Sequence, residues 1–314
     1  MMKFKKPKFW DYKKPNFLSY LLLPLTLPII INNFFLNSKQ RNKDNHQLKK
    51  ICIGNIYIGG TAKTPLTIKI YQILSDLNFK TATIKKFYKS HIDEQKMLTS
   101  KTKLYCLKNR KKALSEVLKD NIEVVIFDDG LQDRSINYDL KFVCFNDIKW
   151  IGNGLLIPAG PLREKIESII KYDAIFINGN ENDNASLKLL INKYNKDIKI
   201  FESYYRVTNI NQFNTSEKYI VFSGIGNPES FKETLLKNKF NIVKEIIFPD
   251  HHDYSQNDID KIKLQAKNLG AKILTTEKDY VKINSYNNVD IKFLQIELDI
   301  KNEKKLINYL KIHL

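Results

Sequence analysis

The sequence predicts an α/β protein built on doubly wound, mostly parallel sheets. Short apolar runs alternate with helical stretches from residue 51 onward, which is typical of βαβ units. Around residues 200–218 the pattern becomes irregular and polar, which favours a hinge and a domain boundary. We therefore predict an N-terminal segment at residues 1–40, a larger α/β domain at 41–205 and a smaller one at 206–314.

The N-terminal segment differs in kind from the rest of the chain. Residues Phe17–Leu36 carry no charge and, if fully helical, would reach across a hydrocarbon core of ~30 Å. Pro24 and Pro28 argue against one straight helix, because proline removes a backbone donor and crowds the preceding turn. We expect a membrane-seated anchor that dips into the leaflet or spans it; a buried helix pair is the alternative. Lysines precede the run at positions Lys3, Lys5, Lys6, Lys8, Lys13 and Lys14, and a polar linker at 37–50 follows it.

The overall composition restricts the partners. The chain of 314 residues has a net charge of +18, but its lysines are scattered and form no basic stripe interleaved with aromatic residues. We therefore expect no nucleic acid partner. Of the three cysteines, Cys52 and Cys144 lie in apolar runs. We therefore expect the cysteines to be buried, unpaired thiols of a protein in a reducing compartment. His251 and His252 have no accompanying cluster with zinc spacing, so a structural metal is not expected.

The predicted strands follow one another in a regular order. The first, Ile51–Ile58, enters a Gly-Gly loop, and Leu66–Leu77 then has the apolar spacing of a helix. The later strand-like runs are Ile122–Asp129, Leu140–Phe145, Asp173–Gly179, Lys218–Gly226, Ala271–Asp279 and Ile291–Leu298.

The loop after the first strand, "IGGTAKTP", has the strand-loop-helix context of a phosphate-binding loop. Backbone N–H groups at a helix start, the Lys63 cation and the Thr64 hydroxyl as a Mg²⁺ ligand would together hold a triphosphate. The full pattern has glycine where this chain has Tyr57 and Ala62, and an ordinary Gly-Gly turn is the alternative. The predicted nucleotide-binding residues are Gly59, Gly60, Thr61, Ala62, Lys63 and Thr64.

A second candidate is the apolar strand "IEVVIFDDG", which ends in Asp128 and Asp129. A Mg²⁺ site beside a phosphate loop needs acids at a strand's carboxyl end. Adjacent residues of a strand point in opposite directions, so one acid would orient Mg²⁺ through water and the other would bind it more directly or order the nucleophile. An exposed Asp-Asp-Gly turn is the alternative.

Two further stretches carry candidate residues. The loop "GNGLLIPAGPLRE" ends on Arg163 and Glu164, where an arginine on a rigid loop would contact a phosphoryl group; a surface turn at a helix start is the alternative. In "FPDHHDY", His251 would orient or deprotonate a catalytic carboxylic acid. A helix-capping cluster explains the same residues.

These stretches, in this order, resemble the tetraacyldisaccharide 4'-kinases, the lipid A 4'-kinases of Gram-negative bacteria. The matching stretches are "IGNIYIGGTAKTP", "FDDGLQDRSINYDLKFVCFND", "GNGLLIPAGPLRE", "FSGIGNPESF", "FPDHHDY" and "TTEKDYVK". They extend over nearly the whole chain and are far more specific than a phosphate-loop pattern.

The resemblance implies transfer of the ATP γ-phosphoryl, with Mg²⁺, to the 4'-hydroxyl of an acylated glucosamine disaccharide 1-phosphate, giving lipid IVA. It implies two α/β/α domains of the P-loop NTPase type joined by a short two-stranded hinge, with an N-terminal membrane-seated helix. The location implied is the cytoplasmic face of the bacterial inner membrane, where the positive charge suits anionic lipids. The oligomeric state is not predicted.

The family's pattern also assigns roles to residues. Lys63 and Thr64 would hold phosphates and Mg²⁺, Asp128 and Asp129 would form the acidic strand end, and Arg163 would stabilise transferred charge. Asp93 in "HIDEQ" matches the family's catalytic base and His251 its histidine partner. Contacts with substrate or phosphate are expected from Tyr88, Gln132 and Glu164.

The chain departs from the family's pattern at three places. Ala62 replaces the loop glycine, the family's "SRGYG" is here Lys85 to Lys89 and keeps only Tyr88, and Asp133 stands where a histidine ordinarily follows "DDGLQ". These departures favour one alternative to an active lipid kinase, a catalytically weakened homologue that binds nucleotide or lipid. Another alternative is a membrane-attached P-loop ATPase, but its loop would carry a second, early lysine, which this loop lacks.

Overall fold

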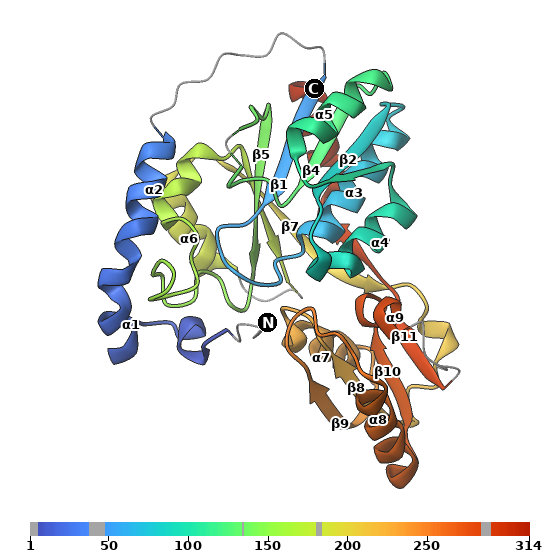
Figure 1. The fold of residues 1–314 in the computed structure, drawn as a ribbon. Coiled ribbons are helices and arrows are strands. Elements are labelled where there is room, and N and C mark those ends of the chain that lie inside the picture. The colour runs from blue at the N-terminus through green and yellow to red at the C-terminus, as the bar shows by residue number, and fades with distance from the viewer. Residues whose placement is uncertain (1–5, 38–47, 134, 180–183, 284–289) are drawn as a thin grey trace. The chain divides into compact units, whose positions relative to one another are not determined.

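A computed structural model describes residues 6–37, 48–133, 135–179, 184–283 and 290–314. Lys3, Lys5 and most of the predicted linker lie outside the described residues. The chain divides into two compact units (Figure 1). The first unit comprises residues 1–87, 101–204 and 300–314, and the second comprises 88–100 and 205–299.

The first unit is built on an eight-stranded sheet with the order β12-β7-β6-β5-β1-β4-β2-β3. β1 lies near its centre and pairs in parallel with β4 and β5. The carboxyl ends of β1, β4 and β2 therefore meet at one edge, where a doubly wound sheet places its ligands. The strands are β1 (Lys49–Gly54), β2 (Thr81–Lys86), β3 (Leu104–Leu107), β4 (Val124–Asp128), β5 (Leu140–Asn146), β6 (Ala174–Asn178), β7 (Lys199–Val207) and β12 (Ile296–Ile300).

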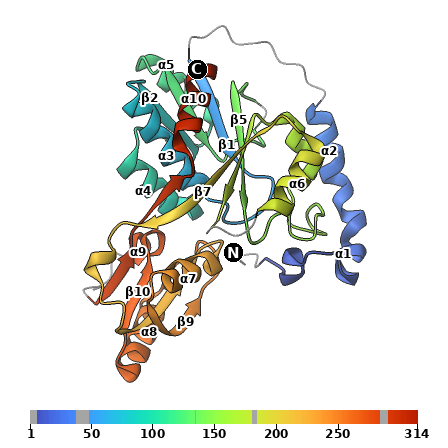
Figure 2. The ribbon, with the colours of Figure 1, turned by 180° about the vertical axis from the view of Figure 1, so that it is seen from behind.

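Helices cover both faces of this sheet. α5 (Arg110–Lys119), α6 (Ala185–Tyr194) and the 3-10 helix at Ile166–Lys171 contribute to one buried apolar cluster. On the other face α3 (Lys63–Asp76) and α10 (Glu303–His313) lie side by side (Figure 2), and Lys69 and Glu303 form an ion pair of 2.6 Å between them. The predicted doubly wound α/β class is confirmed for this unit.

The uncharged N-terminal run folds as three short pieces, which are α1 (Phe17–Leu22), a 3-10 turn (Leu23–Thr26) and α2 (Leu27–Asn37), after a 3-10 helix at Lys8–Asp11. The breaks coincide with Pro24 and Pro28, as expected for residues that cannot continue a helix ladder. Within the part of the chain that the structure describes, none of the helices is both long enough and apolar enough to cross a membrane.

This segment packs on the loop at residues 150–163 of the same unit. The Trp10 indole donates to the Pro158 carbonyl at 2.9 Å, and the buried Asn153 amide donates to the Ser19 hydroxyl at 2.9 Å. Ile29 and Ile30 of α2 pack against a small buried cluster that includes Tyr57. The other side of the segment leaves large apolar side chains exposed.

The second unit is a smaller three-layer structure. Its four-stranded parallel sheet has the order β11-β10-β8-β9. α8 and α9 contribute to the apolar cluster on one face, and α7 to the cluster on the other. The elements are a 3-10 helix (Lys89–His91), α4 (Ile92–Lys101), a 3-10 helix (Ile210–Gln212), β8 (Lys218–Ser223), α7 (Pro228–Lys237), β9 (Asn241–Ile247), α8 (Gln256–Leu269), β10 (Lys272–Thr276), α9 (Glu277–Ile283) and β11 (Ile291–Leu294).

The division of the chain differs from the contiguous domains that the sequence predicted. It falls at residues 204/205, but residues 88–100 belong to the second unit and 300–314 to the first. The last helix belongs to the first unit because Tyr309 packs against Phe142 and Phe201 of the large sheet. β7 and β12 are neighbours in that sheet, and both run across the division.

Candidate active site

The turn between β1 and α3, together with the first two residues of α3, carries the six residues predicted to bind a nucleotide. Ala62 is the N-cap of α3 and has φ 64° and ψ 24°, and Gly59 has φ 143°. Both lie in backbone regions that favour glycine. The buried Asn55 side chain donates to the Thr61 hydroxyl at 3.0 Å and to the Gly59 carbonyl at 3.3 Å. The loop is therefore held by a side chain beneath it, and the first N–H groups of α3 begin directly after Ala62.

Asp128, the last residue of β4, lies buried beneath this turn. Its Oδ2 accepts hydrogen bonds from the Thr64 hydroxyl at 2.9 Å and from the Lys85 ammonium at 2.5 Å. Lys85 is only 3% exposed, so the pair is buried. The negative charge of Asp128 is thus balanced by one lysine from the neighbouring strand β2.

Asp129 points to different partners. Its Oδ1 contacts the Arg163 guanidinium at 3.1 Å and the Lys63 ammonium at 3.9 Å. Its backbone has φ 56°, and its carbonyl accepts a hydrogen bond from Arg110 at 2.6 Å. The turn after β4 therefore directs one acid beneath the loop and the other towards two cations.

Gln132 and Glu164 complete this group. The Gln132 amide donates to the Glu164 carboxylate at 3.1 Å and to the Asn55 carbonyl at 3.0 Å, and its oxygen accepts from Arg163 at 3.0 Å. Glu164 is buried. The orientation of Arg163 is therefore fixed from two sides, by Asp129 and by Gln132.

The residues beneath the loop fit a hard divalent cation. Thr64 and Asp128 offer the oxygen ligands that Mg²⁺ prefers, and the Lys85 ammonium already places a positive charge against Asp128. Among the residues that the structure describes, no group of three or more His, Cys, Asp or Glu side chains is arranged to hold a metal ion. Mg²⁺ bound through one or two protein oxygens together with nucleotide phosphates needs no such group.

The second unit contains a separate charged cluster around Asp93, in the first turn of α4. The Asp93 carboxylate is buried and lies 3.2 Å from Nδ1 of His251. Burial by itself raises the pKa of Asp93, but the hydrogen bond from His251 and the charge of Lys278 outweigh it and hold the pKa well below its ordinary value. The His91 ring stacks on His251 with a centroid distance of 4.3 Å. Asp93 is therefore ionised at neutral pH.

Two lysines of α9 complete the cluster. Lys282 lies 3.3 Å and Lys278 3.5 Å from Asp93, and Lys278 also lies 3.5 Å from both Glu94 and Asp250. Burial opposes the charge of Lys278, but the carboxylates around it raise its pKa above its ordinary value. The cluster is a network in which cations and acids are shared.

The structure thus gathers the predicted residues in two groups. The first unit holds the loop residues with Asp128, Asp129, Gln132, Arg163 and Glu164, and the second unit holds Asp93, His251 and Tyr88. Tyr88 is 43% exposed, and its carbonyl accepts a hydrogen bond from Gln95. Asp133, which replaces the family's histidine, pairs with Arg110 at 3.1 Å.

Sequence reasoning missed several residues that hold these groups in place. In the first unit they are Asn55, Lys85 and Arg110; in the second they are Lys278 and Lys282. The spacing of the last two was a usable signal, because residues four apart share one face of a helix. No comparable pattern marks Asn55 or Arg110, whose roles depend on contacts distant in sequence.

Comparisons with known proteins agree over nearly the whole chain. The family model for tetraacyldisaccharide-1-P 4'-kinase matches residues 18–314. The tetraacyldisaccharide 4'-kinase of Pelagibacter ubique (strain HTCC1062) is 48% identical over 310 residues, covering 98% of each chain. That of Rickettsia canadensis (strain McKiel) is 34% identical over 326 residues, covering 98% of this chain and 96% of the relative.

A solved structure supports the same fold. The crystal structure of LpxK from Aquifex aeolicus in complex with ATP superposes with a TM-score of 0.68 at 22% identity, covering 94% of this chain and 99% of that one. At this identity the match concerns the fold.

Proposed function

The chain belongs to the tetraacyldisaccharide-1-P 4'-kinase family, and we propose which of its residues carry out the reaction. It is an ATP-dependent kinase that uses Mg²⁺ and transfers the γ-phosphoryl of ATP to the 4'-hydroxyl of tetraacyldisaccharide 1-phosphate. The reaction forms a bond between the hydroxyl oxygen and the γ-phosphorus, breaks the bond from that phosphorus to the bridging oxygen, and releases ADP and a proton.

We propose that the turn before α3 binds the ATP phosphates. The observation that carries this assignment is that, at the carboxyl ends of β1 and β4, the Thr64 hydroxyl binds Asp128 and the Lys63 ammonium lies 3.9 Å from Asp129. N–H groups at the start of α3 and the Lys63 ammonium would bind phosphate oxygens, while Thr64 and Asp128 would hold Mg²⁺. Mg²⁺ bound there would supply positive charge that offsets the negative charge developing during transfer.

Arg163 is proposed to stabilise the transferred group. Its guanidinium binds the carboxylate of Asp129, and a phosphoryl group offers the same kind of acceptor. Because Gln132 fixes the guanidinium from a second side, the donor is already oriented. Donors that are oriented in advance lower the barrier because they stabilise the charge that develops in the transition state.

Asp93 is proposed to accept the proton of the sugar hydroxyl, with His251 as its partner. A base must be unprotonated and able to reach the hydroxyl, and the cations around Asp93 keep it ionised. The transition state of phosphoryl transfer is loose in most analyses, so the proton leaves late and a strong base is not required. The hydrogen bond from His251 fixes the direction of the carboxylate.

The assignment of the loop is tested by transfer of label. Purified protein is incubated with γ-labelled ATP, Mg²⁺ and tetraacyldisaccharide 1-phosphate, and label in the bisphosphorylated lipid is measured. Lys63→Ala should lower transfer by at least ~100-fold. Lys69→Ala, which removes the same charge from the same helix, is the control and should transfer normally. Equal activity of the two variants would contradict the phosphate-loop assignment.

We further propose that the N-terminal segment seats the enzyme on anionic lipid at the cytoplasmic face of the inner membrane. The support is a row of exposed apolar side chains beside exposed lysines, as in interfacial helices. Phe17 is 78% and Leu21 63% exposed. Phe17→Ser with Leu21→Ser should abolish co-sedimentation with vesicles that contain anionic lipid. Leu236→Ser with Leu264→Ser, which changes exposed residues of the second unit, should not; loss with both pairs or with neither would contradict the proposal.

A further inference from the structure

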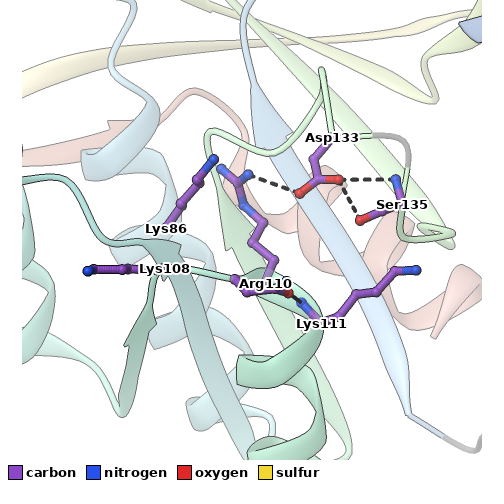
Figure 3. Close-up of a pocket in the computed structure, with 7 residues that line it drawn as sticks. Lys86, Lys108, Arg110, Lys111, Asp133 and Ser135 are labelled. Carbon is purple, nitrogen blue, oxygen red and sulfur yellow. Dashed lines mark hydrogen bonds and ion pairs between the residues drawn. The ribbon is translucent and has the colours of Figure 1, made fainter.

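A cavity lined by cations lies in the first unit, at the carboxyl ends of β2 and β3. It has a volume of about 320 Å³, and we refer to it as the basic pocket (Figure 3). Among the residues that line it, four are cations and one is an acid: Lys86, Lys108, Arg110, Lys111 and Asp133. None of these cations belongs to the nucleotide loop, so the excess of positive charge needs its own explanation.

Arg110 is the fixed part of the basic pocket. It is 8% exposed, and its guanidinium donates to the Asp129 carbonyl at 2.6 Å and to the Asp133 carboxylate at 3.1 Å. Its Nε has no hydrogen-bond partner among the described residues. A buried donor without an acceptor costs free energy, and an anion in the pocket is the ligand that would satisfy it.

Asp133, the one acid among the described residues that line the pocket, already has partners for both of its carboxylate oxygens. One Asp133 oxygen binds Arg110, and the other accepts from the N–H and the hydroxyl of Ser135 at 3.0 and 2.6 Å. Burial opposes ionisation, but the Ser135 hydrogen bonds and Arg110 lower the pKa of Asp133. Asp133 therefore stays charged and balances only part of the positive charge.

The lysines are the adjustable part. Figure 3 shows the Lys86 ammonium beside the Arg110 guanidinium, while Lys108 and Lys111 extend to opposite sides. Lys108 and Lys111 are exposed, so their long side chains can turn inward without breaking buried contacts. The pocket also lies at the start of α5, where the helix field favours negative charge, although the Asn109 side chain already caps the first N–H groups.

We propose that the basic pocket is a subsite for a phosphate group, separate from the nucleotide loop. The basic pocket offers one planar guanidinium and several ammonium groups. A phosphate dianion balances this charge and fills these donors better than a single carboxylate does. Arg110 links the pocket to the catalytic strand end, because it binds the carbonyl of Asp129. Two sources supply this chemistry: the 1-phosphate of the acceptor, in which case the inference rests on the proposed function, and free inorganic phosphate.

Steady-state kinetics with two acceptors test the first source. Tetraacyldisaccharide 1-phosphate is compared with the same disaccharide lacking the 1-phosphate, for the wild type and for Lys108→Ala with Lys111→Ala. Arg110 is left intact because it also supports Asp129. The variant should raise KM for the phosphorylated acceptor about five- to tenfold and leave KM for the other acceptor unchanged. Lys112→Ala with Lys119→Ala removes two charges from the same helix outside the pocket and should change neither.

Calorimetry with inorganic phosphate tests the second source. The Lys63→Ala background removes the contribution of the nucleotide loop. If the pocket variant discriminates between the acceptors, the 1-phosphate is the ligand; if it only loses affinity for inorganic phosphate, free phosphate is. No acceptor discrimination and no loss of phosphate affinity overturns the proposal. A wild type that transfers no label would contradict the proposed function alone, since the calorimetry still decides the pocket.

Discussion

The two units each bury a carboxylate among cations, but they surround it differently. Asp128 of the first unit has one lysine, Lys85, and the hydroxyl of Thr64. Asp93 of the second unit has His251 and two lysines, which also contact other acids. A single lysine can be replaced as charge partner by a bound cation, whereas a shared network keeps its acid ionised at neutral pH. The same side chain is thereby suited to hold Mg²⁺ in one unit and to accept a proton in the other.

Removing the charge of Asp93 should have the largest effect on activity. Asp93→Asn should lower kcat by about 10²–10⁴, because proton transfer to a positioned base contributes in that range. KM for ATP should not change, since the loop residues belong to the other group. Label transfer to the acceptor measures both quantities. Asp260→Asn, a surface change in the same unit, is the control, and normal turnover of Asp93→Asn would refute the base assignment.

The matched change in the first unit should lower stability as well as transfer, because Asp128 is also proposed to hold Mg²⁺. Asp128→Asn removes the carboxylate that lies 2.5 Å from the buried Lys85 ammonium, and breaking a buried pair costs about 3–5 kcal/mol. Asp93→Asn should cost less, because Lys278 keeps Glu94 and Asp250 as partners. Hydrogen exchange of the strand amides of each unit measures the two losses separately.

A double variant sharpens this prediction. Lys85→Met combined with Asp128→Asn removes both charges and should recover most of the stability that Asp128→Asn loses. The two carboxylates would be held in the same way if Asp128→Asn and Asp93→Asn lost equal stability. The same conclusion would follow if the double variant recovered none of the lost stability.

The two groups also differ in how far the sequence predicted them. The loop, the acidic strand end and Arg163 follow one another in short, readable stretches, because a phosphate loop is a local structure. The direction of Asp128 towards Lys85 was not predictable, since it depends on the pairing of β2 with β4. The predicted domain boundary missed residues 88–100 for the same kind of reason: α4 joins the second unit through contacts of Asp93 with residues far along the chain.

Acid should affect the second unit through Asp93. Its pKa is lowered on folding, so its contribution to stability is complete above the ordinary value of 3.8 and is lost as the pH falls below it. Hydrogen exchange of the β8 and β10 amides measures the free energy of opening of the second unit. We expect this free energy to be constant from pH 8 to about pH 5 and to decrease below about pH 4. The loss should be smaller than that from Asp128→Asn.

Asp93→Asn provides the reference for this pH series. Because the amide does not titrate, the part of the acid-induced loss that belongs to Asp93 should disappear in the variant. An identical decline in both proteins would assign the acid sensitivity to other carboxylates and remove the distinction drawn between the two sites.

The smallest effect concerns Ala62, which holds a left-handed backbone conformation at the start of α3. This conformation costs an alanine about 1 kcal/mol relative to glycine, so Ala62→Gly should stabilise the first unit by about that amount or less, because glycine also gains entropy when unfolded. Asn78→Gly, at φ 66° beyond the other end of the same helix, should gain less, since asparagine tolerates this region. Label transfer should be retained in Ala62→Gly, because the methyl group affects the cost of forming the loop and not the groups that bind phosphate. A large gain in transfer without a change in stability would instead mean that the methyl group obstructs the nucleotide.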